Sequence, residues 1–274
     1  METGSGLLIA TFISAGTFNV VFPFILGWWI IRKKQTSWKL FGVGVLTFIG
    51  SQLFHIPLVN GLTVAFQTGA LPHVDPAIAP YFNAVVLGLL AGIFEETARW
   101  IGYKLLKKKG DSLGAALTMG AGHGGVEAVS IGVIVLVNLV AMLGLRYMDT
   151  ATLPLPADQI QLAQQQAQAY FATPWPLPLA GAVERIGAMG LHITLSIMVW
   201  LAISFRKPLW FWGAILYHAL IDGLVVLATS FSLGTWLIEF VFVIISFSVL
   251  YVVLRKAKQM DRERLVLAEP DPAA

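Results

Sequence analysis

The sequence predicts an all-α protein, a polytopic bundle of transmembrane helices with about seven spans. Two observations predict this fold class. Of the 274 residues, 57% are hydrophobic and only 12% are charged, about half the charged fraction of a soluble globular domain. The apolar residues also stand in blocks long enough for a membrane span, which needs about 20 residues. We therefore expect a multi-pass protein of the cell membrane, surrounded by the lipid bilayer and without a nucleic-acid partner.

The apolar segments justify the spans one by one. In chain order they are 7–31, 38–58, 81–103, 113–145, 183–205, 208–231 and 235–254. Aromatic residues typical of the membrane interface stand near their ends, namely Trp28, Trp29, Trp38, Tyr81, Tyr103, Trp210 and Trp212. The N-terminal residues METGSGLL lack the basic stretch of a cleavable signal peptide. The first segment is therefore expected to be retained as a span.

The basic residues predict the orientation of the spans. Of the 18 Lys and Arg residues, 15 fall in connections that one side of the membrane would share: Arg32, Lys33, Lys34, Lys39, Lys104, Lys107, Lys108, Lys109, Arg206, Lys207, Arg255, Lys256, Lys258, Arg262 and Arg264. Because cytoplasmic loops are enriched in basic residues, we expect the N-terminus outside and the C-terminus in the cytoplasm. The formal charge of +3 then marks topology and not an anionic partner.

Two connections on the predicted outer side are long. Residues 59–80 contain Pro72, Pro76 and Pro80 and are expected to form a short re-entrant or surface segment. Residues 146–182 contain the Gln-rich stretch DQIQLAQQQAQAYF, whose apolar residues lie near helical spacing. An interfacial helix and a solvated connector explain that stretch equally well.

The chain is predicted to form one domain. Residues 1–258 make up a single transmembrane helical domain, because no hydrophilic stretch is long enough to build a second one. Residues 259–274 are polar and contain proline, so they are expected to form a disordered cytoplasmic tail. The chain contains no cysteine, which excludes disulfides, thiolate metal sites and cysteine nucleophiles.

Ionisable residues inside the spans point to a functional site, because each costs about 2.5–3.5 kcal/mol on insertion scales. The third segment contains Glu95, Glu96 and Arg99, the fourth contains His123 and Glu127, and the sixth contains His218 and Asp222. At about 1.5 Å per residue, the glutamates lie roughly 10–12 Å and both histidines about 15 Å from the cytoplasmic ends of their helices. Glu127 and Asp222 follow one turn further in, at about 21 Å. Three helices thus bring their polar residues to one level, in the cytoplasmic half.

The residue types at this level predict acid–base chemistry. Arg99 is permanently charged and can hold a neighbouring glutamate in its ionised form. A charged glutamate beside two imidazoles can activate water, while an imidazole stabilises the oxyanion that develops. Glu127 and Asp222, each four residues after a histidine, would orient the imidazole nitrogens, or cap a polar network without contacting substrate. Glycines around His123 would allow close helix packing or peptide access.

Three motifs carry a resemblance to a known family. EETAR at 95–99, GHGGVEA at 122–128 and HALID at 218–222 resemble the motifs of the YhfC-type intramembrane proteases, which are related to the CAAX-protease and bacteriocin-processing group. The three motifs span about 130 residues and occur in the matching order. The arginine follows the second glutamate at three residues and not four, and Asp222 stands where asparagine is common in the broader group. Both departures favour the YhfC branch.

The resemblance implies a site and a reaction. Glu95 or Glu96 would be the general base that activates water, and His123 and His218 would stabilise the oxyanion or bind a metal. Arg99, Glu127 and Asp222 would support them. We favour metal-independent, glutamic-type chemistry without a cofactor, since an HExxH motif is absent. Zinc is the alternative, held by His123, His218 and one of the two glutamates.

The leading functional hypothesis is an intramembrane endopeptidase that cleaves a membrane-associated or lipidated substrate in the cytoplasmic half of the bilayer. One alternative is a proton-coupled transporter that uses the same residues as a relay. Another is a catalytically inert scaffold that binds a second membrane protein. His55 and His192 are interpreted as packing or access-path residues nearer the outer half, and no role is expected for Glu239 or His73.

Overall fold

The computed structural model of the protein describes residues 3–149, 154 and 156–268, and the regular structure in these residues is entirely helical. The prediction of an all-α bundle is confirmed. In chain order the elements are α1 (Thr3–Lys34), α2 (Trp38–Gln67), α3 (Ala79–Leu106), the 3-10 helix η1 (Lys107–Gly110), α4 (Leu113–Tyr147), α5 (Ala157–Phe171), α6 (Leu177–Ser204), α7 (Leu209–Ser230) and α8 (Thr235–Ala268).

Seven of these helices coincide with the seven predicted segments. Six helices in the described residues are long and apolar enough to cross a membrane, namely α1, α2, α4, α6, α7 and α8. The protein is therefore a multi-pass membrane protein. α3 is as long as α6 but is more polar, because it contains Glu95, Glu96 and Arg99. The count of seven spans and the orientation of the termini stay predictions.

In three connecting or terminal segments the structure decides between the sequence-based expectations or departs from them. α2 continues to Gln67, so the first part of 59–80 is helical. The Gln-rich stretch forms α5, and Tyr170 of α5 stacks on Phe12 of α1 with ring centroids 4.5 Å apart. The predicted tail is wrong for residues 259–268, which extend α8; residues 269–274 lie outside the described part.

The extension of α8 has a physical cause in its side-chain contacts. Arg264 donates a hydrogen bond to Asp111 (2.8 Å) and another to Asp261 (3.0 Å), one turn earlier in α8. Gln259 donates to Glu263 at 2.8 Å, again one turn apart. These contacts stabilise the end of α8. The helix therefore continues through residues whose polar composition predicted a disordered tail.

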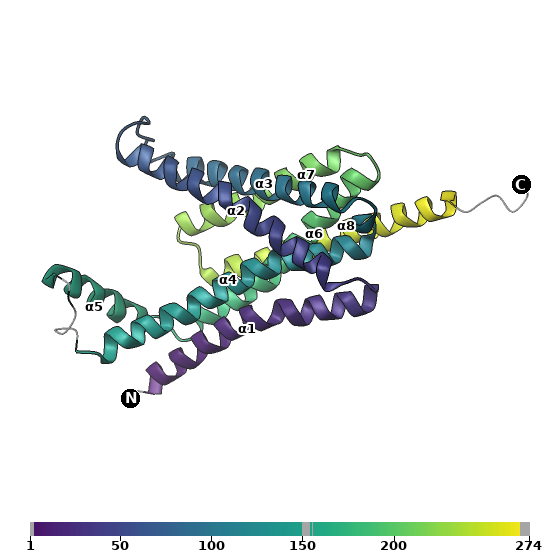
Figure 1. Cartoon of the computed structure of the whole chain (residues 1–274). Coiled ribbons are helices and arrows are strands. Elements are labelled where there is room, and N and C mark those ends of the chain that lie inside the picture. The colour runs from purple at the N-terminus through teal and green to yellow at the C-terminus, as the bar shows by residue number, and fades with distance from the viewer. Residues whose placement is uncertain (1–2, 150–153, 155, 269–274) are drawn as a thin grey trace, which may run out of the picture.

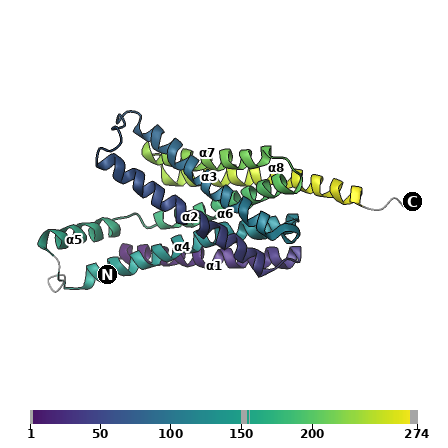
Figure 2. The same ribbon diagram turned by 45° about the horizontal axis from the view of Figure 1, so that its top comes forward.

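The helices run between two ends of an elongated bundle (Figure 1). The α1–α2, α3–α4 and α6–α7 connections lie at one end, together with the C-terminal part of α8. We call it the basic end, since it contains the basic residues 32–39 and 104–109. The other end, the α5 end, contains α5, the start of α1 and the α2–α3 and α7–α8 connections, and Figure 2 shows the same separation from a second direction.

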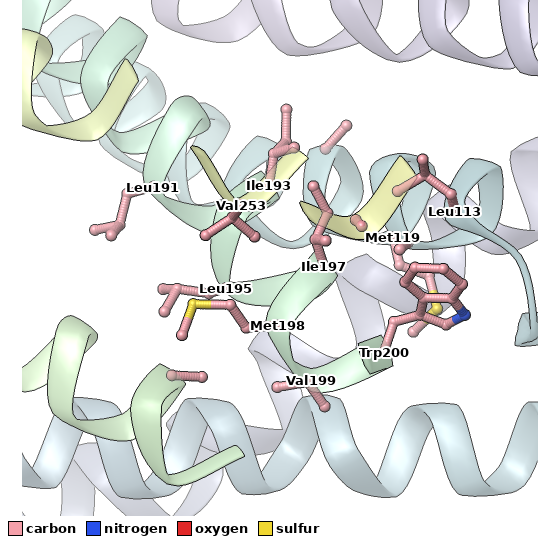
Figure 3. Packing of buried hydrophobic residues seen from close by; sticks show 14 of the residues in the cluster. Leu113, Met119, Leu191, Ile193, Leu195, Ile197, Met198, Val199, Trp200 and Val253 are labelled. Carbon is pink, nitrogen blue, oxygen red and sulfur yellow. The ribbon is translucent and has the colours of Figure 1, made fainter. Parts of the chain in front are cut away.

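α6 lies in the centre of the bundle. In its most apolar stretch of 18 residues 89% of the residues are buried, against 17–33% in the other five candidate spans. Leu191 to Trp200 of α6 pack against Leu113 and Met119 of α4 and Val253 of α8 (Figure 3). α6 therefore contacts protein on nearly all sides, whereas its neighbours each keep an apolar face toward the surroundings.

Glycines allow the helices around the polar residues to approach backbone to backbone. A Cβ at Gly122 of α4 would lie 2.0 Å from the carbonyl oxygen of Phe41 in α2, and one at Gly88 of α3 would lie 2.3 Å from that of Ala219 in α7. Gly124 leaves room for the ring of His192, which lies 2.7 Å from a Cβ built there. The prediction that small residues around His123 permit close packing is confirmed.

Candidate active site

The predicted site residues converge in the interior of the bundle. Glu95, Glu96 and Arg99 extend from α3, His123 from α4 and His218 from α7. All five side chains are buried; Glu95 is the most exposed of them at 6%, and Glu96 is fully buried. The structure thus brings together the residues that the depth argument placed at one level.

Glu95 is the centre of the first group of contacts. Its Oε2 lies 3.0 Å from Nε2 of His123 and 3.8 Å from Nε2 of His218. Its Oε1 accepts a hydrogen bond from the side-chain amide of Gln52 at 3.2 Å. The far nitrogen of His123, Nδ1, lies 2.9 Å from the hydroxyl of Thr47. The carboxylate is therefore held from both sides, with one oxygen directed at two imidazoles.

Glu96 belongs to a second, enclosed group. Its Oε1 accepts a hydrogen bond from Arg99, and the same oxygen lies 2.8 Å from Nδ1 of His218. Arg99 also lies 3.8 Å from Oε2 of Glu95. Because Arg99 cannot lose its proton, it supplies fixed positive charge to both carboxylates. Glu96, which Arg99 contacts, thus holds the Nδ1 side of the His218 ring, while Nε2 of His218 faces Glu95.

His192 of α6 also belongs to the site, contrary to the sequence-based interpretation. Arg99 donates a hydrogen bond to its Nδ1 at 2.6 Å, and its Nε2 lies 2.5 Å from Oε2 of Glu127. Its ring stands between those of His123 and His218, with centroids 5.3 and 5.7 Å away. The depth of His192 could have revealed this from the sequence. His192 lies 12 residues, or about 18 Å, before the end of α6, which is within the range of depths of the other site residues.

Arg185 and Glu184, also of α6, were missed as well. Neither residue was expected in the site from the sequence, yet Arg185 is only 6% exposed. Its guanidinium lies 2.7 Å from Glu127 and also contacts Glu184. A chain of contacts among carboxylates, guanidiniums and one imidazole therefore runs from Glu96 through Arg99, His192, Glu127 and Arg185 to Glu184.

Of the two expected acid–histidine pairs within one helix, the structure contains one. Oδ2 of Asp222 lies 3.5 Å from Nε2 of His218, as the spacing predicted. Glu127 pairs with Arg185 and His192 in α6, and the partners of His123 are Glu95 and Thr47. The prediction that Glu127 orients His123 is wrong, because contacts between helices replace the contact within α4.

A cavity of about 450 Å³ opens beside these residues. Glu95, His218, His192, Glu127 and Asp222 line its wall, and Glu96 does not. The remaining lining is mixed, with Gln52, His55, Ile56, Val59, Asn60, Leu87, Glu184, Arg185, Ala188, Leu191, Ile221, Val225, Val226 and Phe242. A molecule in the cavity would thus reach one of the two adjacent glutamates only.

The cavity extends from the polar residues toward the α5 end. Val59 and Asn60 lie near the end of α2, Glu184 near the start of α6, and Val226 near the end of α7. His55 also lines the cavity, where it stacks on Phe94 with ring centroids 5.9 Å apart. Its expected position beside an access path therefore agrees with the structure. Glu239 and His73 lie outside the lining.

The residues also fit a metal ion. Glu95, His123 and His192 offer ligand atoms within 4.8 Å of one another. Both nitrogens of His192 are engaged, however, because Arg99 donates to one and Glu127 contacts the other. His218, the third ligand expected from the sequence, is not in this group of three, although its Nε2 lies 3.8 Å from Glu95 and Glu96 contacts its Nδ1, as is typical of metal-binding histidines.

The comparisons with known proteins identify the family of the chain. The family model described as YhfC intramembrane metalloprotease matches residues 18–245, a range that contains every residue of the site. The uncharacterized membrane protein YhfC of Bacillus subtilis (strain 168) is 29% identical over 216 residues, which cover 76% of this chain and 80% of that protein. No match was found among solved structures.

Proposed function

The chain belongs to the YhfC family of intramembrane metalloproteases, and we propose that it is an endopeptidase that hydrolyses a peptide bond of a membrane-associated or lipidated substrate. The observation that carries the proposal is the contact of Glu95 with His123 and His218 at the wall of the cavity. The site lies in the half of the bundle nearer the basic end, which is the predicted cytoplasmic half.

Glu95 is the proposed general base. Its carboxylate takes a proton from a water molecule in the cavity while the water oxygen bonds to the carbonyl carbon of the substrate. Arg99 lies 3.8 Å from Oε2 of Glu95 and keeps this carboxylate negatively charged until the carboxylate accepts that proton. His123 fixes the direction of the same oxygen, and Thr47 holds His123 from the other side. Glu96 is not a candidate base, because it is fully buried and outside the cavity wall.

His218 is the proposed donor to the oxyanion. Attack on the carbonyl carbon converts the carbonyl oxygen into an oxyanion, and Nε2 of His218 faces the cavity where that oxygen would lie. Glu96 accepts a hydrogen bond at Nδ1, which fixes the ring, and Asp222 lies 3.5 Å from Nε2. When the C–N bond breaks, the leaving amine takes the proton from Glu95, which restores the carboxylate.

A metal ion is the alternative way to activate the water. Zinc would be held by Glu95, His123 and His218, and when bound it would supply a Lewis acid that acidifies its water. The excess of carboxylates over guanidiniums around the cavity would favour a cation. We propose the metal-independent form, because Arg99 already supplies fixed positive charge 3.8 Å from the oxygen that contacts both histidines.

The test is hydrolysis by the purified protein of a library of synthetic peptides, each with about 20 apolar residues between lysines. Glu95→Gln and His218→Ala should each lower kcat by about 10²–10⁴-fold, while Glu239→Gln, outside the site, should leave it unchanged. Each assay is repeated with a strong chelator. Undiminished cleavage by Glu95→Gln and His218→Ala would contradict the proposal. Loss with the chelator that zinc restores would replace the metal-independent form by the zinc form.

A further inference from the structure

A second, apolar cavity continues the candidate active site toward the outside of the bundle. It has a volume of about 280 Å³ and lies between α7 and α8. Ile221, Val225 and Phe242 line both cavities. Because these three residues line both, the two cavities are adjacent. We call the second cavity the α7–α8 gap.

The gap follows from the way in which α7 and α8 are packed. α7 packs along α3, where Gly88 and Gly92 bring the two backbones together, and α8 packs along α6. α7 and α8 themselves pack only loosely against each other, although they are neighbours in the chain. Each helix is thus positioned by a different partner, and the space between them is left open.

The lining of the gap is entirely apolar and partly exposed. Leu224, Ala228, Leu233, Leu237, Ile238, Val241 and Ile245 complete it. Leu224 is 46% exposed and Leu237 is 60% exposed, so the gap is accessible from the surroundings of the bundle. In a membrane these surroundings are hydrocarbon, which admits an apolar segment and excludes a charged one.

The reaction limits the conformation of what binds. In an α-helix each backbone carbonyl accepts a hydrogen bond from the amide four residues on, which shields the peptide bond from attack. The residues beside the scissile bond are therefore expected to be extended. An extended segment in the gap would pass Ile221 and Val225, which flank Asp222 in α7, and would thereby reach His218.

We propose that the α7–α8 gap binds an extended, apolar segment of the substrate polypeptide next to the scissile bond, and that substrates reach the site laterally through it. This inference rests on the proposed peptidase function and adds the substrate class, namely polypeptides with apolar residues beside the cleaved bond. The polar cavity toward the α5 end then supplies water to Glu95, separately from the apolar path of the substrate.

The test uses the absence of cysteine in the chain. Ala228→Cys, in the gap, gives the protein one thiol that a bulky maleimide can modify after folding, so that a folding defect does not interfere. Ala141→Cys, an exposed position of α4 near the same end, is the matched control. Modification of the first variant should lower hydrolysis of the lysine-flanked apolar peptides at least tenfold, and modification of the second should not change it.

A second measurement separates this inference from the proposed function. In a variant that combines Glu95→Gln with Ala228→Cys, the uncleaved peptides should slow modification of the thiol, whether or not catalysis occurs. If the modified Ala228→Cys variant hydrolyses the peptides as fast as the unmodified one, the gap inference is overturned and the peptidase proposal stays intact. If the unmodified protein cleaves no peptide, the peptidase proposal fails, and protection of the thiol alone decides whether the gap binds polypeptide.

Discussion

The two sides of α7 differ in how they pack. Toward α3, glycines permit backbone contact, and a Cβ at Gly88 or Gly92 would lie within 2.3 or 2.6 Å of a carbonyl oxygen of α7. Toward α8, a cavity of about 280 Å³ remains. The tight side holds His218 against Glu96, and the gap on the loose side shares Ile221, Val225 and Phe242 with the cavity that His218 lines. In the proposed peptidase, one helix would combine the rigidity that catalysis requires with the opening that a substrate requires.

The largest effect is expected from disturbing the tight side. Gly88→Leu should prevent folding, because the added side chain would collide with the backbone of α7 at Ala219. The measurement is the monodisperse fraction after size-exclusion chromatography in detergent. Gly42→Ala, where a Cβ meets nothing within 4 Å, is the control and should stabilise α2 by up to about 1 kcal/mol. A folded Gly88→Leu protein would show that α3 and α7 can separate without loss of the fold, which would contradict the prediction.

The next effect concerns the buried charges beside the tight side. Glu96→Gln should lower the free energy of unfolding by about 3 kcal/mol, because it removes the nearer of the two carboxylates that Arg99 contacts, in a fully buried position. Glu95→Gln should cost less than about 1 kcal/mol, since Glu95 borders the cavity and retains its amide partner. Thermal unfolding in detergent measures both, and equal losses would contradict the division into an enclosed and a reactive glutamate.

A smaller effect is expected on the loose side. Leu224→Ala should cost less than about 1 kcal/mol, because Leu224 borders the gap and is 46% exposed. Leu195→Ala, the same substitution at a fully buried position of α6, should cost about 2–5 kcal/mol. The comparison of their unfolding temperatures checks whether the gap is open. A loss at Leu224 as large as that at Leu195 would mean that α7 and α8 pack closely there.

The smallest effect concerns the far end of α8, where Arg264 pairs with Asp111. Partial burial alone would raise the pKa of Asp111, but hydrogen bonds from Ser204 and Arg264 outweigh it and lower the pKa below its ordinary value of 3.8. The pair therefore contributes stability above pH 4 and loses it as the pH falls through the lowered pKa. Asp111→Asn should cost less than about 1 kcal/mol at pH 7, and a cost that does not decrease as the pH is lowered would contradict the pairing.

The sequence predicted the helices well, because apolar runs between basic and aromatic residues carry strong signals. The same information could not distinguish Glu95 from Glu96, since adjacent helical residues differ by about 100° in direction and only the packed bundle shows which one borders the cavity. Glu127 was assigned to His123 by the spacing within α4, and its contacts with Arg185 and His192 depend on how α4 meets α6. Partners across helices were therefore the part that spacing did not reveal.

The central place of α6 has a consequence for biosynthesis. α6 contains Arg185 and His192, and almost none of its surface faces lipid. The segment is apolar enough to cross a membrane, but its ionisable residues are costly in hydrocarbon. Arg185 and His192 therefore depend on α3 and α4, which are synthesised before α6, for their partners. α7 and α8 leave the ribosome last and cover the sides that remain. A chain interrupted after α6 would expose these ionisable residues to the bilayer and become a substrate for quality-control proteolysis.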